Sequence, residues 1–319
     1  MLSLAFVAFL AACNPTLRFD EVWVEEDGAL VSVWGHPDGQ DWVVGGQIEQ
    51  GAAWVGSGTD WSALEVPEGV GLLNWVHGSD PDDVWIGGIG GALLHWDGVE
   101  LTHVDLGIDE AIWGVFAASS DEVYAVGGSS AFGGESATAW RYDGSEWMPI
   151  ALPPEVAETP SLFKVTAVGS DIWMVGAQGR ALTGRDESWS LVSTGTAEDL
   201  VTVVADGSEA VIVGGRVTGT VFRGSVNGLD PVASTPSGLF GVSVLADGRT
   251  LVSGVRGFLA TVGPEVDEFQ LLDVPNEHLL HAVWTTPGEF AYAVGGNLQS
   301  SIGPYRGTLL VARAPEGTR

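Results

Sequence analysis

The feature that most constrains the fold is an internal repeat. A bulky residue three positions before a glycine recurs along the chain at intervals of about 40 residues, a spacing typical of tandem structural units. Five copies carry an aromatic residue and two carry an aliphatic one. The pairs are Trp42/Gly45, Trp85/Gly88, Tyr124/Gly127, Trp173/Gly176, Val211/Gly214, Leu251/Gly254 and Tyr292/Gly295. A regular repeat of this kind predicts one modular domain.

Each repeat contains four short apolar segments bounded by Gly, Asp, Ser or Pro, as expected for β-strands separated by turns. In the second repeat they are LLNWVHG, DVWIGG, ALLHWDG and ELTHVDL. Many segments lack strict apolar–polar alternation, which indicates sheets covered on both faces. Four strands in about 40 residues are typical of a propeller blade. We therefore predict an all-β, seven-bladed β-propeller with four-stranded blades, at about 29–66, 71–107, 111–153, 161–194, 199–234, 238–275 and 279–313.

The glycine-rich stretch Ser79–Gly98 (SDPDDVWIGGIGGALLHWDG) has two interpretations. A phosphate-binding loop needs a helix directly after the glycines, because the helix N-terminus supplies the N–H groups that hold the anion. Here a short apolar run and an Asp-Gly turn follow instead. The stretch is therefore predicted to be a hairpin within one blade.

The two ends of the repeat region complement each other. The last repeat, which begins at Leu280, stops after three strands, and 17–25 precedes the first repeat as a spare strand. Pairing 17–25 with 307–313 closes the ring and removes exposed sheet edges. We expect a single propeller domain over 17–317, in which the N-terminal strand completes the last blade.

The first residues, MLSLAFVAFLAAC, form an apolar run that is too short to span a bilayer as a helix. An apolar region followed by small residues is typical of a secretory signal, and LAAC at Leu10–Cys13 resembles a bacterial lipobox. We expect a signal peptide over 1–12, lipidation at Cys13 and a tether over 13–16. The chain is then exported across the inner membrane and anchored in the outer membrane. The alternative is an ordinary signal peptide followed by a buried thiol.

The formal net charge is −30 at pH 7, and Lys164 is the only lysine. Such a surface repels phosphate backbones, which excludes nucleic acid as a partner. Solubility, including in salty water, is the simplest reason for the acidity, and capture of a cation or a basic partner is the alternative. The chain has one cysteine, so packing alone holds the fold, and we expect a monomer.

The repeats resemble secreted seven-bladed propellers of the BNR/Asp-box group, which is sialidase-like and photosystem-assembly-factor-like, and most of all lipoprotein propellers of the myxobacterial type. The Asp-box turn of that group, roughly D-G-x-x-W, is matched in full by DGSEW at Asp143–Trp147. Asp97-Gly98 lacks the tryptophan, and the stretch from Asp186 to Trp189 is one residue short. The resemblance implies the fold, and its motif residues are turn and packing residues without a catalytic role.

Sialidases of this group hold the substrate carboxylate with three arginines and use a tyrosine nucleophile, so the resemblance raises a glycan-binding or glycoside-cleaving alternative. Propeller connectivity places the loops between second and third strands on one face, the top face. Residues of these loops form a candidate ligand rim, namely Arg180, Arg216, Arg256, Tyr305 and Arg306. Surface arginines that balance an acidic protein are the simpler interpretation. The Phe-Arg-Ile-Pro motif of sialidases is absent.

Other catalytic and metal-binding patterns are missing from the sequence. The six histidines show neither HExxH spacing nor a Cys/His cluster, and SDPDD at 79–83 lacks the spacing of a calcium loop. There is no G-x-S-x-G elbow. We expect no catalytic residues, no metal and no cofactor.

Acidic residues gather in the loops between blades, which share the top face. The candidate partner-binding residues are Asp109, Glu110, Glu198, Asp199 and Glu277, although loops are polar in general. The strand at 17–25 starts on the opposite, bottom face, so a lipid on Cys13 turns the top face away from the membrane. The sequence thus predicts a membrane-tethered, non-enzymatic binding or scaffold module with a protein partner of the cell envelope on its top face.

Overall fold

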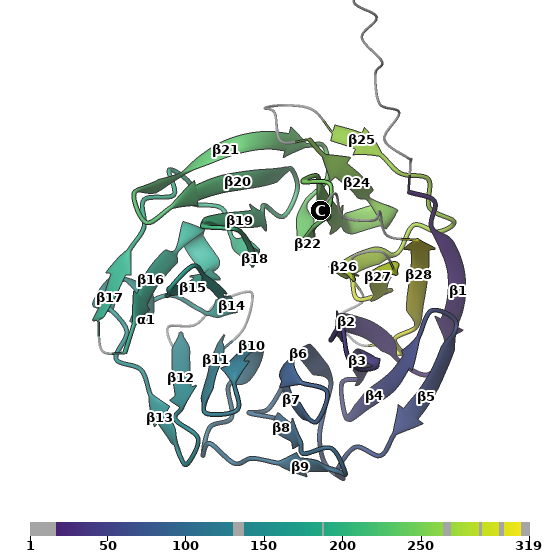
Figure 1. The fold of residues 1–319 in the computed structure, drawn as a ribbon, viewed down its shortest axis with the longest axis horizontal. Coiled ribbons are helices and arrows are strands. Elements are labelled where there is room, and N and C mark those ends of the chain that lie inside the picture. The colour runs from purple at the N-terminus through teal and green to yellow at the C-terminus, as the bar shows by residue number, and fades with distance from the viewer. Residues whose placement is uncertain are drawn as a thin grey trace, which may run out of the picture.

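The computed structural model describes residues 17–129, 137–186, 188–263, 269–286, 289–299 and 303–313. Their strands form seven antiparallel sheets of four strands each, arranged as a ring (Figure 1). The first strand of each blade lies nearest the central axis, next to the first strands of the neighbouring blades. The predicted architecture of seven four-stranded blades is confirmed.

Within a blade the strands follow one another outward. Blade one comprises β2 (Ala29–Gly35), β3 (Asp41–Gln47), β4 (Gln50–Ser57) and β5 (Asp60–Leu64). Blade two comprises β6 (Leu73–Asp80), β7 (Asp83–Gly88), β8 (Leu93–Trp96) and β9 (Leu101–His103). Blade three comprises β10 (Ala111–Ser119), β11 (Glu122–Gly128), β12 (Thr138–Tyr142) and β13 (Trp147–Pro149). Blade four comprises β14 (Leu162–Val168), β15 (Asp171–Gly176), β16 (Ala181–Arg185) and β17 (Ser188–Leu191).

The remaining blades continue the same order, except that the last one takes its outer strand from the N-terminal region. Blade five comprises β18 (Leu200–Asp206), β19 (Glu209–Gly214), β20 (Gly219–Ser225) and β21 (Gly228–Thr235). Blade six comprises β22 (Leu239–Val244), β23 (Thr250–Gly254), β24 (Leu259–Val262) and β25 (Phe269–Leu271). Blade seven comprises β26 (Leu279–Thr285), β27 (Phe290–Gly296), β28 (Gly307–Arg313) and β1 (Asp20–Glu25). The described helical turns are α1 (Pro154–Ala157), η1 (Ala177–Gly179) and η2 (Val255–Gly257).

A close backbone approach explains the repeated glycine. A Cβ on Gly45 would lie 1.9 Å from the carbonyl oxygen of Ala29, and one on Gly295 would lie 1.8 Å from that of Leu279. No side chain fits at such distances, so this position of the second strand accepts only glycine. The glycine of the sequence repeat therefore marks the place where the backbones of the two inner strands of a blade approach most closely.

β1 closes the ring. It pairs antiparallel with β28, with Asp20 opposite Val311. Trp23 packs edge-on against Trp54 of blade one, at 4.9 Å between ring centroids, and Phe19 is buried among residues of blades six and seven. The N-terminal segment thus contacts three blades, and its predicted place as the last blade's outer strand is confirmed.

The top face carries two sets of loops that bond to each other. The N–H of Gly91, between β7 and β8, donates to the carbonyl oxygen of Glu110 at 3.0 Å, and that of Gly257 donates to the carbonyl oxygen of His278 at 2.6 Å. Gly90 and Gly91 have φ values of 64° and 69°. The glycine-rich stretch is therefore a tight turn between two strands, as predicted, and not a phosphate loop.

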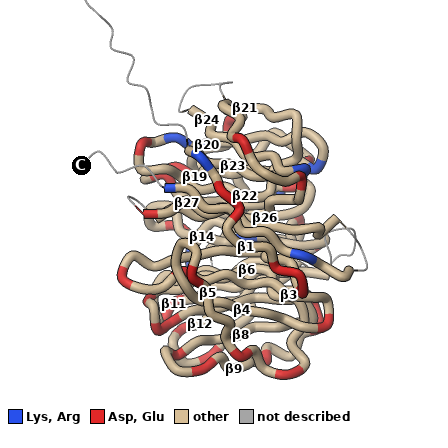
Figure 2. Tube along the Cα trace, turned by 90° about the vertical axis from the view of Figure 1, so that its right-hand side faces the viewer, with Lys and Arg blue, Asp and Glu red and all other residues tan. Residues whose placement is uncertain are grey.

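Acidic residues are spread over the loops of the disc. Figure 2 shows the disc edge-on, with acidic positions spread over many loops and few basic positions between them. Among the described residues, no helix has the length and apolar character needed to cross a membrane.

Candidate functional site

The inner strand of every blade contains a β-bulge. Its register with the second strand skips one residue in all seven blades, between Leu30 and Ser32 in blade one and at the matching place in the others. A bulge re-aims one side chain, and bulges are frequent next to functional sites. The seven bulge residues are Val31, Asn74, Trp113, Phe163, Val201, Phe240 and His281.

Six of these seven bulge residues line one pocket, which lies on the central axis at the top face. We call it the mouth pocket, and its volume is about 110 Å³. The lining residues are Asn74, Trp113, Phe163, Lys164, Asp199, Val201, Arg216, Phe240 and His281. A concave, mostly apolar site with a few polar groups is the usual composition of a ligand site.

Lys164 is the most unusual residue of the mouth pocket. Its Nζ donates a hydrogen bond to the carbonyl oxygen of Trp113 at 2.8 Å and lies 4.3 Å from the centre of the Trp75 ring in blade two. The side chain reaches across blade three at Gly114, where a Cβ would lie 3.0 Å from the Cα of Lys164. Burial lowers the pKa of Lys164 to about 7, because the charged form loses its hydration.

His281 lines the same pocket from blade seven. Its Nδ1 donates a hydrogen bond to the carbonyl oxygen of Val31 at 2.8 Å, since a carbonyl can only accept. Burial, with the positive charge of Lys164 as the second cause, lowers the pKa of His281 to about 3. The imidazole is therefore neutral at pH 7, and its Nε2 is left as a hydrogen-bond acceptor.

Two residues that the sequence assigned to different candidate sites pair at the rim of the mouth pocket. Arg216 Nε lies 2.7 Å from Asp199 Oδ2, and Asp199 Oδ1 accepts a hydrogen bond from the N–H of Gln178 at 3.0 Å. The Asp199 side chain is only 13% exposed. Asp199 thus ties together two loops of the top face.

The other members of the candidate ligand rim lie on three loops and do not line the mouth pocket. Arg180 is half-buried after η1, Arg256 is exposed in η2, and Arg306 is exposed and ion-paired with Glu26. Tyr305 is 7% exposed and packs against residues of blade one. The structure therefore brings only one rim arginine to the pocket.

The remaining candidate acidic residues also lie in loops of the top face. Asp109, Glu198 and Glu277 are exposed, and Glu110 is half-buried. None of these four lines the mouth pocket. The predicted lipidation site, Cys13, lies outside the described residues.

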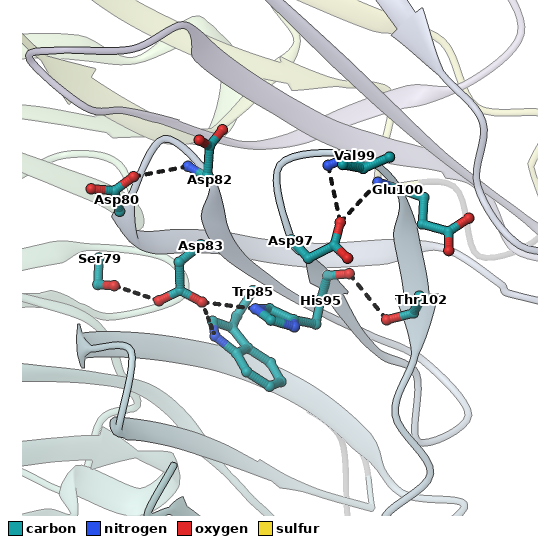
Figure 3. Close-up of polar contacts among 10 residues, drawn as sticks. All are labelled: Ser79, Asp80, Asp82, Asp83, Trp85, His95, Asp97, Val99, Glu100 and Thr102. Atoms are coloured by element: carbon teal, nitrogen blue, oxygen red, sulfur yellow. Dashed lines mark hydrogen bonds and ion pairs between the residues drawn. The ribbon is translucent and has the colours of Figure 1, made fainter. Parts of the chain in front are cut away.

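A second polar cluster lies in blade two around the turn between β6 and β7, on the face opposite the mouth pocket, and Figure 3 shows its hydrogen bonds. Asp83 accepts hydrogen bonds from Trp85 Nε1 at 3.1 Å, from His95 Nε2 at 2.7 Å and from Ser79 Oγ. Burial raises the pKa of Asp83, but hydrogen bonds, first that of His95, lower it overall. A catalytic triad needs the histidine between serine and carboxylate. Here the carboxylate stands between them, so the cluster braces a turn and does not activate Ser79.

The Asp-box matches are turns as well. Asp143 Oδ1 accepts hydrogen bonds from the N–H of Glu146 at 3.0 Å and from the hydroxyl and N–H of Ser145 at 2.7 Å and 2.9 Å, and these bonds lower the pKa of Asp143 to about 2. Asp97 Oδ1 likewise accepts hydrogen bonds from the N–H groups of Val99 and Glu100, both at 3.0 Å (Figure 3). Among the described residues, no group of His, Cys, Asp or Glu is placed to hold a metal ion.

Solved structures with the same ring of blades cover almost the whole chain. The WD40 β-propeller domain of Doa1 matches with a TM-score of 0.69, 11% identity, and coverage of 92% of this chain and 97% of that one. The chain is a β-propeller. YCF48 from Cyanidioschyzon merolae matches with a TM-score of 0.62, 12% identity, and coverage of 93% and 98%. YCF48 bound to D1 peptide matches with a TM-score of 0.65, 11% identity, and coverage of 94% and 97%.

At such identities the propellers named above show the fold alone. No protein-family model matches the sequence, and no curated protein matches it either. The function of this propeller therefore has to be argued from its own residues.

The mouth pocket was missed in the sequence, because its bulge residues share no residue type. A usable pattern exists nonetheless. Every bulge residue directly follows a buried Leu or Ile, such as Leu73 before Asn74 and Ile112 before Trp113. Aligning the repeats on that aliphatic residue marks the residues that point to the axis.

Proposed function

We propose that this propeller is a membrane-tethered, extracytoplasmic binding or scaffold module without enzymatic activity, and that it holds a protein partner of the cell envelope on its top face. The observation that carries the proposal is the mouth pocket, where bulges of six blades build one concave site with Trp113, Phe163 and Phe240 in its walls. Partners are anchored in well-packed pockets of this kind, and aromatic residues are enriched there.

Arg256 supports the top face as the binding surface. Its φ of 57° is left-handed, which costs a non-glycine residue roughly 1–2 kcal/mol. Blade two has Gly90 at the matching place, with a φ of 64°. An exposed arginine thus occupies a place where glycine would be relaxed, and blade four has Gln178 there with a φ of 58°. Strain of this kind is common at functional sites, and arginine is enriched at protein interfaces.

The course of the N-terminal segment supports the tether. β1 starts at the bottom face, because Asp20 pairs with Val311 near the end of β28. About four residues separate Cys13 from this segment, a reach of roughly 14 Å. A lipid on Cys13 then keeps the bottom face close to the outer membrane and leaves the top face free.

The structure of YCF48 bound to D1 peptide offers a parallel, since that propeller binds a peptide. We propose protein binding for this chain because its own mouth pocket offers an aromatic, concave site. The glycan-binding alternative is less well supported, because a carboxylate-binding cluster needs arginines that are free and converge. Arg216 and Arg306 are already paired with carboxylates, and Tyr305 is buried.

Photo-crosslinking from two matched positions tests this function. Val217, on the top face between β19 and β20, is 80% exposed, and Val99, on the bottom face between β8 and β9, is 81% exposed. A photoreactive amino acid at position 217 should give a discrete adduct in native envelope membranes. The same group at position 99 should give none.

Two further variants complete the design. Arg256→Gly should weaken the adduct from position 217 while leaving the fold intact, because glycine relaxes the left-handed turn. Cys13→Ser should move the chain from the membrane fraction to the soluble fraction. Equal adducts from both positions contradict a top-face partner, and membrane retention of Cys13→Ser contradicts the lipid tether.

A further inference from the structure

Lys164 combines burial with a positive charge that no acidic group balances. It is 4% exposed, and its Nζ contacts a carbonyl oxygen and an indole ring. In the described part of the chain it forms no ion pair. Burial is the one cause that lowers its pKa, and no carboxylate raises it again. A buried cation without a counter-charge is costly, so Lys164 is partly neutral at pH 7 and would gain from an anion placed beside it.

The mouth pocket is therefore locally positive within a chain of net charge −30. Its charged lining residues are Lys164, Asp199 and Arg216, and the latter two neutralise each other in an ion pair. His281 is neutral and is itself influenced by the charge of Lys164. The charge left without a counter-charge is that of Lys164, which is about half protonated at pH 7 because its pKa is about 7.

The size and walls of the pocket define what else a ligand must have. An apolar cavity of about 150 Å³ in another protein holds a benzene molecule, so 110 Å³ has room for a body of about four carbon atoms. Trp113, Phe163 and Phe240 offer apolar surface to that body, and Asn74 adds an amide. A small anion with an alkyl group fits these walls.

We propose that the mouth pocket binds a free short-chain monocarboxylate, with its carboxylate at Lys164 and its alkyl group against Trp113, Phe163 and Phe240. The mouth pocket also carries the proposed function, so the free acid and an anchoring side chain of the protein partner are alternative occupants of the same pocket. Binding exchanges the unbalanced charge for a charge-assisted hydrogen bond. Isobutyrate is the probe, because its three-carbon alkyl group fits the apolar part of the pocket.

The single lysine gives a direct spectroscopic test. In protein labelled with ¹³C at the lysine side chain, the only lysine resonance belongs to Lys164. Isobutyrate should shift this resonance saturably, with a dissociation constant of about 1 mM or lower, and should raise the pKa of Lys164, since a nearby anion favours the charged form. Isobutyramide, which has the same shape without the charge, should do neither. Equal effects of the two compounds, or no saturable shift with isobutyrate, overturn the proposal.

Calorimetry of substituted variants tests whether Lys164 binds the carboxylate of isobutyrate. Lys164→Met should weaken isobutyrate binding at least about tenfold, and Lys164→Arg should retain part of it. Arg313→Met, which removes one positive charge at the far end of β28, should leave the affinity unchanged. An N-acetylated peptide with a free C-terminal carboxylate is the control for a protein source of the carboxylate, and it should bind more weakly than isobutyrate. If the peptide binds and isobutyrate does not, the carboxylate comes from a protein, and the free-acid proposal is wrong.

Discussion

At the scale of single residues, the junction of blades seven and one depends on a buried carboxyl group. Asp41, which is 4% exposed, accepts a hydrogen bond from the Tyr292 hydroxyl at 2.5 Å, and that hydroxyl accepts one from the N–H of Gly58 at 2.8 Å. Gly35 leaves room for the carboxyl group, since a Cβ there would lie 1.9 Å from Asp41 Oδ1. Burial, partly offset by the Tyr292 bond, raises the pKa of Asp41 to about 6.

This pKa predicts how stability changes with pH. The ordinary value is 3.8, so between the two values the folded protein holds a proton that the unfolded chain releases. Asp41 therefore adds stability as the pH falls below 6, and this contribution is lost as the pH rises through 6. Relative to Asp41→Asn, the wild type should gain about 2 kcal/mol of unfolding free energy from about pH 7.5 to about pH 4.5. Urea unfolding at both pH values measures this gain, and parallel curves for the two proteins would contradict it.

At the scale of elements, β1 and the segment before it hold the ring closed. The blades are consecutive in sequence except at this point, where 17–25 must find a distant partner. Phe19 is 6% exposed in the cluster between blades six and seven, whereas Val24 on β1 is 47% exposed. The closure therefore depends on a few apolar contacts as well as on the strand pairing.

Two substitutions in this segment should differ sharply in effect. Phe19→Ala should lower the free energy of unfolding by about 3 kcal/mol, the usual cost of emptying a buried aromatic site. Val24→Ala, only a few residues away, should change it by less than about 0.5 kcal/mol. Urea denaturation of the two variants beside the wild type makes the comparison. Equal losses would mean that the segment is held by backbone pairing alone.

The same elements show what the sequence could and could not predict. The seven repeats and the closing strand were predictable, because close backbone approach forces glycine at positions such as Gly45 and Gly295. The mouth pocket was not, because a bulge is set by strand register, and residues as different as Val201 and His281 occupy it. The Asp199–Arg216 pair was also hidden, since it joins two loops whose proximity only the folded blades create.

At the scale of the whole molecule, charge acts against the compact state. The net charge of −30 at pH 7 rests on 42 acidic and 12 basic residues in a chain of 319. The described ion pairs engage only a minority of the carboxylates. The remaining negative charges repel one another over the surface of the disc, which favours solubility and disfavours folding.

Salt should therefore stabilise the propeller. Raising the ionic strength from about 0.01 M to about 0.15 M shortens the screening length from about 30 Å to about 8 Å, which weakens repulsion between loops of different blades. We expect the thermal midpoint to rise by at least about 2 °C, a shift that corresponds to about 1.3 kcal/mol for a chain of this size. Sodium chloride and tetramethylammonium chloride should act alike at equal ionic strength, because screening does not depend on a cation site. A rise with sodium alone would instead indicate a bound cation, and a flat or falling midpoint would show that repulsion does not limit stability.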